Sequence, residues 1–244
     1  MIQSASTPEL QTEFLRRIAH KPYFESTLGT HLHLFGNHPA SGWAFYLLPG
    51  SAVLELRGGS AVLCGALPGG EAGEDAREEL TGFLRFLHAD TLRTEHPLTL
   101  PGWQPAAPLT LWELPKGRAL PLPPSRLVFA ESDAEADEFY SAACTALAHG
   151  VGTCRALLHN GRPVCTVGCY EQSDTESYMA AGVTDPAWQG RGLARYLIVG
   201  LANELTAERA VRFACFPALC GFYAQLGFLQ IGKIQHYTTD WNTT

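Results

Sequence analysis

The segment from residue 177 to residue 208 restricts the fold of this chain more than any other. An apolar stretch over 177–183 comes first, a short loop over 184–189 follows, and leucines then recur at every fourth position. These leucines are Leu193, Leu197, Leu201 and Leu205. An apolar run is typical of an interior strand, and the four-residue repeat is typical of a helix that buries one face. The sequence therefore predicts a strand, a loop and a helix over about 192–208.

The loop that enters this helix reads Gln189-Gly190-Arg191-Gly192-Leu193-Ala194. The first turn of a helix offers unpaired backbone N–H groups and a partial positive charge, which suit a pyrophosphate. Gly190 and Gly192 have no side chain to block a phosphate, and Arg191 is able to add a charged contact. Other phosphate loops fit less well. The chain has no Gly-Lys-Ser/Thr, and a dinucleotide fingerprint requires a small residue where Arg195 stands.

The rest of the C-terminal half alternates strands with helices, which indicates an α/β (α+β) fold with a mixed central sheet flanked by helices. Asn160-Gly161 is a strong signal for a tight turn between two strands. The expected strands are 126–130, 153–158, 164–169, 211–216, 228–231 and 234–239. The expected helices are one that follows Ser132 and Asp133 and carries Phe139, Tyr140 and Leu147, and one over 217–226.

The N-terminal half shows a comparable order of elements. The sequence predicts a helix over 8–20, strands over 43–48, 52–56 and 61–67, an acidic Gly-rich loop over 68–74, and a helix over 75–88. Eight prolines lie between His96 and Pro124, so helices are excluded there, although a short strand at 109–114 is compatible with the sequence. We expect an N-terminal half over 1–95, an ordered linker over 96–125 and a C-terminal domain over 126–244.

Composition narrows the classes of function. The net charge of -7 gives no indication of the basic face that a nucleic-acid-binding protein would show. No apolar run is long enough to span a membrane. The seven cysteines include no Cys-x-x-Cys pair, which favours a reducing cytoplasm and no metal site. His31, His33 and His38 form a loose cluster, for which an ordinary loop is the favoured interpretation over metal binding.

Two blocks of sequence together resemble the GNAT superfamily of N-acetyltransferases. The cofactor motif of that family, Arg/Gln-x-x-Gly-x-Gly/Ala, is met by Gln189, Gly192 and Ala194, and Val183 and Pro186 precede it. Downstream, the stretch 222–228 (Phe-Tyr-Ala-Gln-Leu-Gly-Phe) looks like the second motif of the family. The resemblance covers about the last 120 residues.

The resemblance implies acetyl-CoA as cosubstrate and a small-molecule or peptide amine as acceptor. Backbone amides from Gly190 to Ala194 would hold the pyrophosphate. The strand end formed by Ala181, Gly182 and Val183 would pair with the pantetheine arm. Tyr223 would protonate the departing thiolate. The implied cofactor-binding residues are Ala181, Gly182, Val183, Gln189, Gly190, Arg191, Gly192, Leu193 and Ala194.

Several alternatives stay open. Many family members carry an asparagine where this chain has Phe216, so one cofactor contact is in question. Glu171 and Glu176 are candidate bases, yet each also fits a surface carboxylate, and Cys215 fits a buried structural thiol better than a nucleophile. A non-catalytic acyl-CoA-binding module is therefore the alternative to an enzyme.

Tandem members of the family, in which one half is degenerate, provide an interpretation of the N-terminal half. Three carboxylates over 68–75 would repel a pyrophosphate there. This hypothesis requires a mixed sheet with a hairpin within residues 40–95. Neither the acceptor nor the oligomeric state can be inferred from the sequence.

Overall fold

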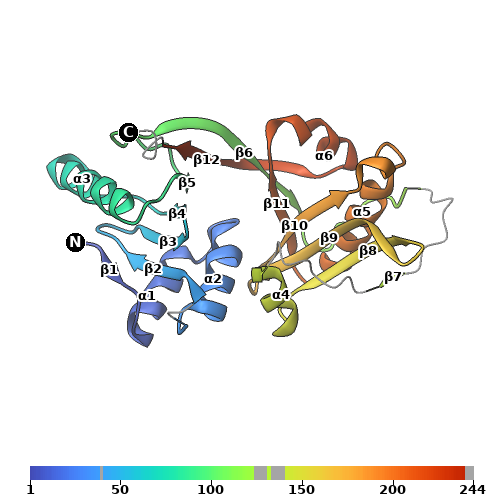
Figure 1. The fold of residues 1–244 in the computed structure, drawn as a ribbon, viewed down its shortest axis with the longest axis horizontal. Helices are drawn as coiled ribbons and strands as arrows, with labels where there is room; N and C mark the ends of the chain where they lie inside the picture. The colour runs from blue at the N-terminus through green and yellow to red at the C-terminus, as the bar shows by residue number, and fades with distance from the viewer. Residues whose placement is uncertain (39–40, 124–130, 133–140, 240–244) are drawn as a thin grey trace. The chain divides into compact units, whose positions relative to one another are not determined.

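A computed structural model describes residues 1–38, 41–123, 131–132 and 141–239 (Figure 1). The chain divides into two compact units. The first comprises Met1–Thr110, Ala214–Pro217 and Gly232–Thr244, and the second comprises Leu111–Phe213 and Ala218–Ile231. Each unit is described by itself below.

The first unit begins with two helices and continues as a sheet with one crossover helix. Thr7 caps the first helix by accepting a hydrogen bond from the Leu10 N–H, and Pro8 occupies its first turn. The elements are β1 (Gln3–Ser4), α1 (Pro8–Ile18), α2 (Phe24–Phe35), β2 (Trp43–Leu47), β3 (Val53–Arg57), β4 (Ser60–Cys64), α3 (Gly70–Phe86), β5 (Thr91–Thr94) and the later part of β12 (Leu229–Thr238).

The sheet of the first unit is mixed, with strand order β1-β2-β3-β4-β5-β12. Strands β2, β3 and β4 pair antiparallel, β4 and β5 pair parallel across the α3 crossover, and β12 pairs antiparallel with β5. The hairpin within residues 40–95 and the mixed sheet that the tandem hypothesis requires are therefore both present. Leu54, Leu80, Leu84 and Leu92 are fully buried between α3 and the sheet. Each such side chain contributes roughly 1.5–3 kcal/mol through burial.

The second unit repeats this order of elements. Its elements are β6 (Gln104–Leu114, within this unit from Leu111), β7 (Glu131–Ser132), α4 (Ser141–Ala148), β8 (Thr153–His159), β9 (Arg162–Gln172), β10 (Glu176–Thr184), the 3-10 turn η3 (Pro186–Trp188), α5 (Leu193–Leu205), β11 (Ala210–Cys215, within this unit to Phe213), the 3-10 turn η4 (Pro217–Leu219), which straddles the two units, α6 (Cys220–Leu226) and the first residues of β12. The strand order is β6-β11-β10-β9-β8-β7.

The pairing in the second unit matches that of the first. Strands β8, β9 and β10 pair antiparallel, and β10 and β11 pair parallel across the α5 crossover. The β8–β9 turn is made by Asn160 and Gly161, with φ of 52° and 77°, as the Asn-Gly pair predicts. Leu193, Leu197 and Leu201 are buried, so the leucine repeat is the face of α5 that packs on the sheet. The predicted fold class is confirmed.

Three expectations were wrong or incomplete. Helix α2 occupies Phe24–Phe35, where the sequence predicts a loop around His31. The helix was missed because the stretch buries nearly all its faces and carries no capping signal. Helix α3 begins at Gly70, so most of the expected acidic loop is helical. The two expected final strands are one strand, β12. The expected strand at 126–130 and the residues Phe139 and Tyr140 lie outside the described residues.

Candidate active site

The loop before α5 is a glycine turn that is open to solvent. Gly190 and Gly192 have φ of 74° and 79°, a left-handed conformation in which L side chains are strained. A Cβ added at either position would meet nothing within 4 Å. Backbone conformation therefore requires the two glycines, and the space above them is available to a ligand.

The start of α5 fits an anion. Gly192 is the N-cap residue, so no side chain caps the first turn, and this turn contains no acidic residue. Its N–H groups are therefore left to a group from outside the helix. This arrangement fits the pyrophosphate that the sequence predicts at Gly190–Ala194.

Side-chain contacts hold the loop that leads to this turn. Asp185 Oδ1 accepts a hydrogen bond of 2.8 Å from the Ala187 N–H. Gln189 Nε2 donates to the Thr184 carbonyl over 3.2 Å, so the side chain of the cofactor motif closes its own loop on the end of β10. The loop is thus fixed in shape by local hydrogen bonds.

Arg191 lies on an aromatic ring rather than free in solvent. Its guanidinium carbon is 4.5 Å from the ring centroid of Trp188, and its Nη2 donates to the Ala187 carbonyl over 3.1 Å. The ring of His159, at the tip of the β8–β9 hairpin, is centred 4.5 Å from Trp188. No sequence pattern singles out Trp188 or His159, since contact between a hairpin tip and a distant loop leaves no periodic signal.

Strand β10 becomes irregular before it reaches the loop. Its pairing with β9 shifts register between Ala180 and Val183, a bulge that displaces Ala181 and Gly182 from the regular ladder. Val183 is 52% exposed, and a Cβ at Gly182 would meet nothing within 4 Å. The strand end predicted to pair with the pantetheine arm is thus irregular and open at Gly182–Val183.

Tyr223 lies on α6 within an aromatic cluster. Its ring centroid is 4.3 Å from that of Phe213 on β11, 5.1 Å from that of Phe222 and 6.2 Å from that of Phe228. The ring is partly exposed. These contacts hold the ring of Tyr223 against β11, which is the parallel neighbour of β10. Phe216, where many family members have asparagine, follows β11 and is 54% exposed.

Of the two candidate bases, Glu176 is engaged in an ion pair. Its side chain is fully buried and is paired with Arg212, which also bonds Glu113 over 2.7 Å. Burial lowers the pKa of Arg212, but the two carboxylates raise it by more, so the net shift is upward. Glu176 is therefore engaged in a buried ion pair that supports the structure. Glu171 is partly exposed on β9, opposite Tyr178 on β10.

The cysteines on strands β9 and β11 have the properties of core thiols. Cys215 is buried on β11. Burial raises the pKa of Cys165, and it raises that of Cys169 to about 11. Such thiols are protonated at neutral pH, which disfavours nucleophilic catalysis. Within the part of the chain that the structure describes, no three His, Cys, Asp or Glu side chains are grouped to hold a metal ion.

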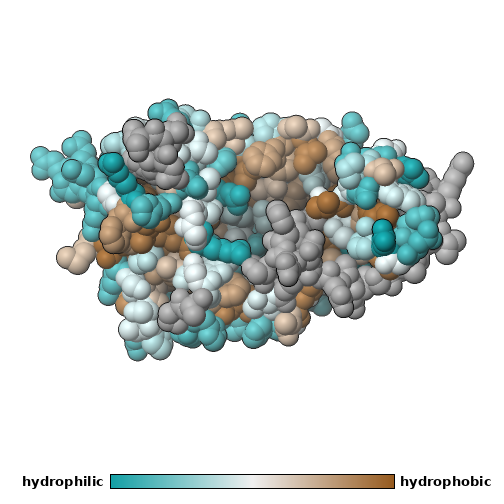
Figure 2. Space-filling model, viewed as in Figure 1, coloured by the Kyte–Doolittle hydropathy of each residue, from teal (hydrophilic) through white to brown (hydrophobic). Residues whose placement is uncertain are grey.

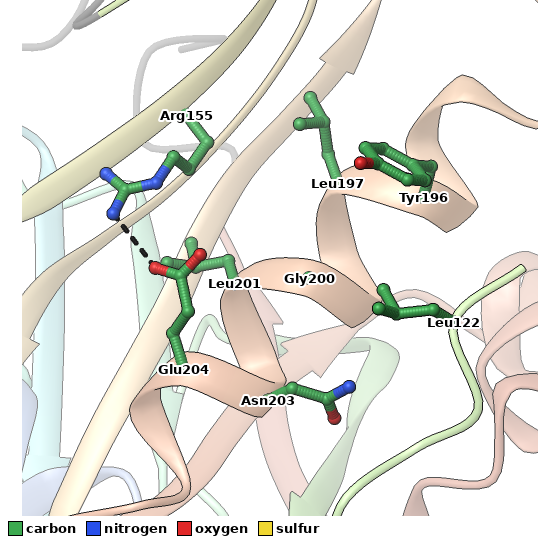
Figure 3. A pocket seen from close by; sticks show the side chains of 8 residues that line it. All are labelled: Leu122, Arg155, Tyr196, Leu197, Gly200, Leu201, Asn203 and Glu204. Atoms are coloured by element: carbon green, nitrogen blue, oxygen red, sulfur yellow. Dashed lines mark hydrogen bonds and ion pairs between the residues drawn. The ribbon is translucent and has the colours of Figure 1, made fainter. Parts of the chain in front are cut away.

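A pocket of about 340 Å³ lies along α5, further from its start. Figure 3 shows Arg155 and Glu204 facing one another at this pocket, joined by an ion pair of 2.9 Å. Asn203 also lines it and holds the segment before Leu122 by bonding the backbone N–H and carbonyl of Leu120. None of the predicted cofactor residues lines this pocket, so it is separate from the glycine turn.

The first unit has a different environment at the matching position. The first two turns of α3 carry Glu71, Glu74 and Asp75. At the ends of the parallel strands β4 and β5, Glu95 Oε2 accepts a hydrogen bond of 2.9 Å from the Gly65 N–H and lies 2.6 Å from Lys21 Nζ. The carboxylates at the start of α3 and the side chain of Glu95 thus occupy the positions that correspond to the open glycine turn and the open strand end of the second unit.

Two units with the same mixed sheet, one of which has an open and uncapped helix start, define the chain as a tandem α/β fold. The family model described as "Acetyltransferase (GNAT) family" matches residues 118–228. The predicted resemblance is confirmed. This match supports acetyl transfer as the general activity.

Solved structures show the same fold over the whole chain. A tandem GNAT protein from the clavulanic acid biosynthesis pathway is 13% identical, with a TM-score of 0.63, over 100% of this chain and 99% of that chain. A GCN5-related N-acetyltransferase from Sphaerobacter thermophilus is 11% identical, with a TM-score of 0.64, over 99% and 95%. One from Kribbella flavida is 16% identical, with a TM-score of 0.58, over 79% and 88%. The search of curated proteins finds no match.

Among the described helices, none combines the length and apolar character required to cross a membrane.

Proposed function

We propose that the chain is an N-acetyltransferase that moves the acetyl group of acetyl-CoA to a primary amine by direct attack. The observation that carries this proposal is the glycine turn at Gly190 and Gly192, open and uncapped, at the start of α5. It follows directly on an irregular strand end with an exposed Val183. The α3 helix of the first unit, with its acidic first turns, lacks this combination.

Each part of the site has a role in the proposed reaction. The N–H groups from Gly190 to Ala194 hold the pyrophosphate, with Arg191 adding positive charge. The backbone of Ala181–Val183 aligns the acyl arm and offers donors to the oxyanion that develops on the thioester carbonyl. Gln189 keeps the loop closed through its bond to Thr184.

The chemistry transfers one acetyl group without a covalent enzyme intermediate. A new N–C bond forms as the amine attacks the thioester carbon, and the C–S bond breaks. An alkyl amine has a pKa of about 10, so water or a carboxylate must take its proton before attack. Tyr223 gives its phenolic proton to the departing thiolate and then regains one from solvent.

The test of the enzyme hypothesis follows thiol release from acetyl-CoA in the presence of a panel of amines that includes polyamines, amino acids, aminoglycosides and peptides. We expect turnover with at least one class of amine. Tyr223→Phe should keep acetyl-CoA affinity and lower kcat by about 10²-fold or more, within the range for loss of a general acid. Unchanged turnover in this variant would remove Tyr223 from the mechanism.

A non-catalytic acyl-CoA-binding module is the second candidate, which Phe216 favours because its exposed ring stands where many family members have an amide. Calorimetry separates the two functions. Tight binding of acetyl-CoA without thiol release across the whole amine panel would support the module and contradict the enzyme.

A further inference from the structure

Trp112 on β6 is a buried donor without an acceptor. Its side chain is 4% exposed. Its indole Nε1 is shielded from solvent and has no hydrogen-bond partner among the described residues. Buried donors in native proteins are nearly always paired, and an indole N–H usually finds a partner. A partner from outside the described residues, such as an ordered water or a bound ligand, is therefore expected.

The position of Trp112 connects it with the proposed reaction. Its ring centroid is 6.5 Å from that of Tyr223, in the cluster that also contains Phe213 and Phe228. Its neighbour Glu113 bonds Arg212 on the other face of the sheet, as the alternation of side chains along a strand requires. The orphan donor therefore lies on the face of the sheet that carries the phenol of Tyr223.

The surroundings make this donor costly to keep. Aromatic rings line the cluster, and Figure 2 shows further hydrophobic surface beside α6, where Leu219, Leu229 and Ile231 are exposed large hydrophobic residues. In such a medium an unpaired N–H loses its hydrogen bond to water and gains none in return. A phenylalanine would fill most of the same space without that loss, so packing alone does not explain an indole at this position.

We propose that the indole N–H of Trp112 donates a hydrogen bond to a carbonyl oxygen of the acyl-pantetheine arm bound beside Tyr223. This inference rests on the proposed function, because it takes acetyl-CoA as the ligand. The contact adds a side chain on β6 to an arm-binding site that otherwise comprises the β10 backbone over Ala181–Val183 and the phenol of Tyr223. Its role is to bind and position the arm, and no proton is transferred.

The experiment measures affinities by calorimetry for acetyl-CoA and for adenosine 3′,5′-bisphosphate, which has the nucleotide but no arm. Trp112→Phe should weaken acetyl-CoA binding about 3- to 10-fold and leave the bisphosphate affinity unchanged. The apo protein should keep or raise its Tm, because the orphan donor is gone. The matched control is Trp103→Phe, which alters a similarly buried indole in the first unit and should leave both affinities unchanged.

A readout on the wild-type protein does not depend on how the variant folds. The indole ε1 proton of Trp112, assigned through backbone connectivities, should shift when acetyl-CoA binds and stay in place when the bisphosphate binds. An unshifted resonance, or an unchanged acetyl-CoA affinity in Trp112→Phe together with a lower apo Tm, would assign the indole a structural role and overturn the proposal. A wild-type protein that binds no acetyl-CoA would overturn the proposed function as well.

Discussion

The guanidinium of Arg191 rests on the indole ring of Trp188, 4.5 Å from its centroid, at the entrance to the open glycine turn. The ring of His159 lies at a similar distance from the same indole. Trp188 thus links the β8–β9 hairpin to the loop and keeps Arg191 near the start of α5. A positive charge held in place before a ligand arrives costs less entropy when the ligand binds.

Replacement of Trp188 should therefore weaken cofactor binding rather than catalysis. An exposed cation–π contact is worth about 0.5–1 kcal/mol, which corresponds to about a 2- to 5-fold change. We expect Trp188→Ala to raise the KM for acetyl-CoA by about this factor with kcat unchanged, and Trp188→Phe to recover part of the loss. A fall in kcat alone, measured by steady-state kinetics, would contradict this role.

Gly192 should not tolerate a side chain, even though the space around it is open. Its φ of 79° costs an L residue about 1–2 kcal/mol, and the strain falls on the N-cap of α5. Gly192→Ala should lower the free energy of unfolding by that amount and weaken acetyl-CoA binding at least 5-fold. Gly200→Ala, in the interior of the same helix, should instead stabilise the protein by about 0.5–1 kcal/mol. Urea denaturation of both variants checks the contrast.

The chain should bind one acetyl-CoA, not two. In the first unit, Glu71, Glu74 and Asp75 surround the start of α3, and Glu95 bonds the Gly65 N–H at the end of β4. Carboxylates at that position repel a pyrophosphate. Calorimetric titration should give a stoichiometry of one per chain, and Gly192→Ala should weaken that single event. Two equivalent binding events would refute the assignment of the first unit as inactive.

The local elements of the fold could be predicted because their signals are local. The leucine repeat of α5 and the Asn160-Gly161 turn each depend on a few neighbouring residues, and both predictions are confirmed. Helix α2 was missed because Ser26, Thr27 and His31 are buried in it, so it shows no polar face. The residue before it, Tyr23, has a φ of 73° and gives no capping signal.

The long-range pairings could not be predicted from sequence patterns. Gly232 separates the two strands that the sequence predicts, but the structure has one continuous strand, β12, through this residue. The strand continues because residues 235–238 pair with β5 of the first unit. In the candidate site, the glycine turn was visible in the sequence. The contacts of Trp188 with His159 and of Trp112 with Tyr223 join residues from distant elements, and no spacing rule connects them.

The buried ion pair of Glu176 gives a prediction on stability. Removal of one partner leaves a buried charge uncompensated, which costs about 3–5 kcal/mol. Arg212→Met should therefore destabilise the chain by about that amount in urea denaturation. Adding Glu176→Gln to this variant should recover part of the loss, because the stranded charge is removed. A double variant no more stable than Arg212→Met would show that Glu113 or packing accounts for the loss.

Glu95 predicts how the stability of the first unit depends on pH. Burial raises the pKa of its carboxyl, but the bonds to Lys21 and the Gly65 N–H lower it by more, so the net pKa lies below its ordinary value of 4.5. A group whose pKa is lower in the folded state stabilises the fold above its unfolded pKa. That stability is lost as the pH falls through the folded pKa. The ion pair should thus be fully effective at pH 7 and weaken progressively below about pH 4.5.

Glu95→Gln removes this dependence. We expect the variant to be less stable than the wild type by about 1–2 kcal/mol at pH 7, since a hydrogen-bonded charge is lost. At pH 3.5, below the ordinary pKa of 4.5, the difference should be smaller, because the unfolded carboxyl is then mostly protonated and the wild type loses part of the stability that its lowered pKa provides. Urea denaturation at the two pH values measures this, with the exposed Glu71→Gln as a control that should differ little from the wild type at either pH. An equal loss at both pH values would show that Glu95 acts through packing and not through its charge.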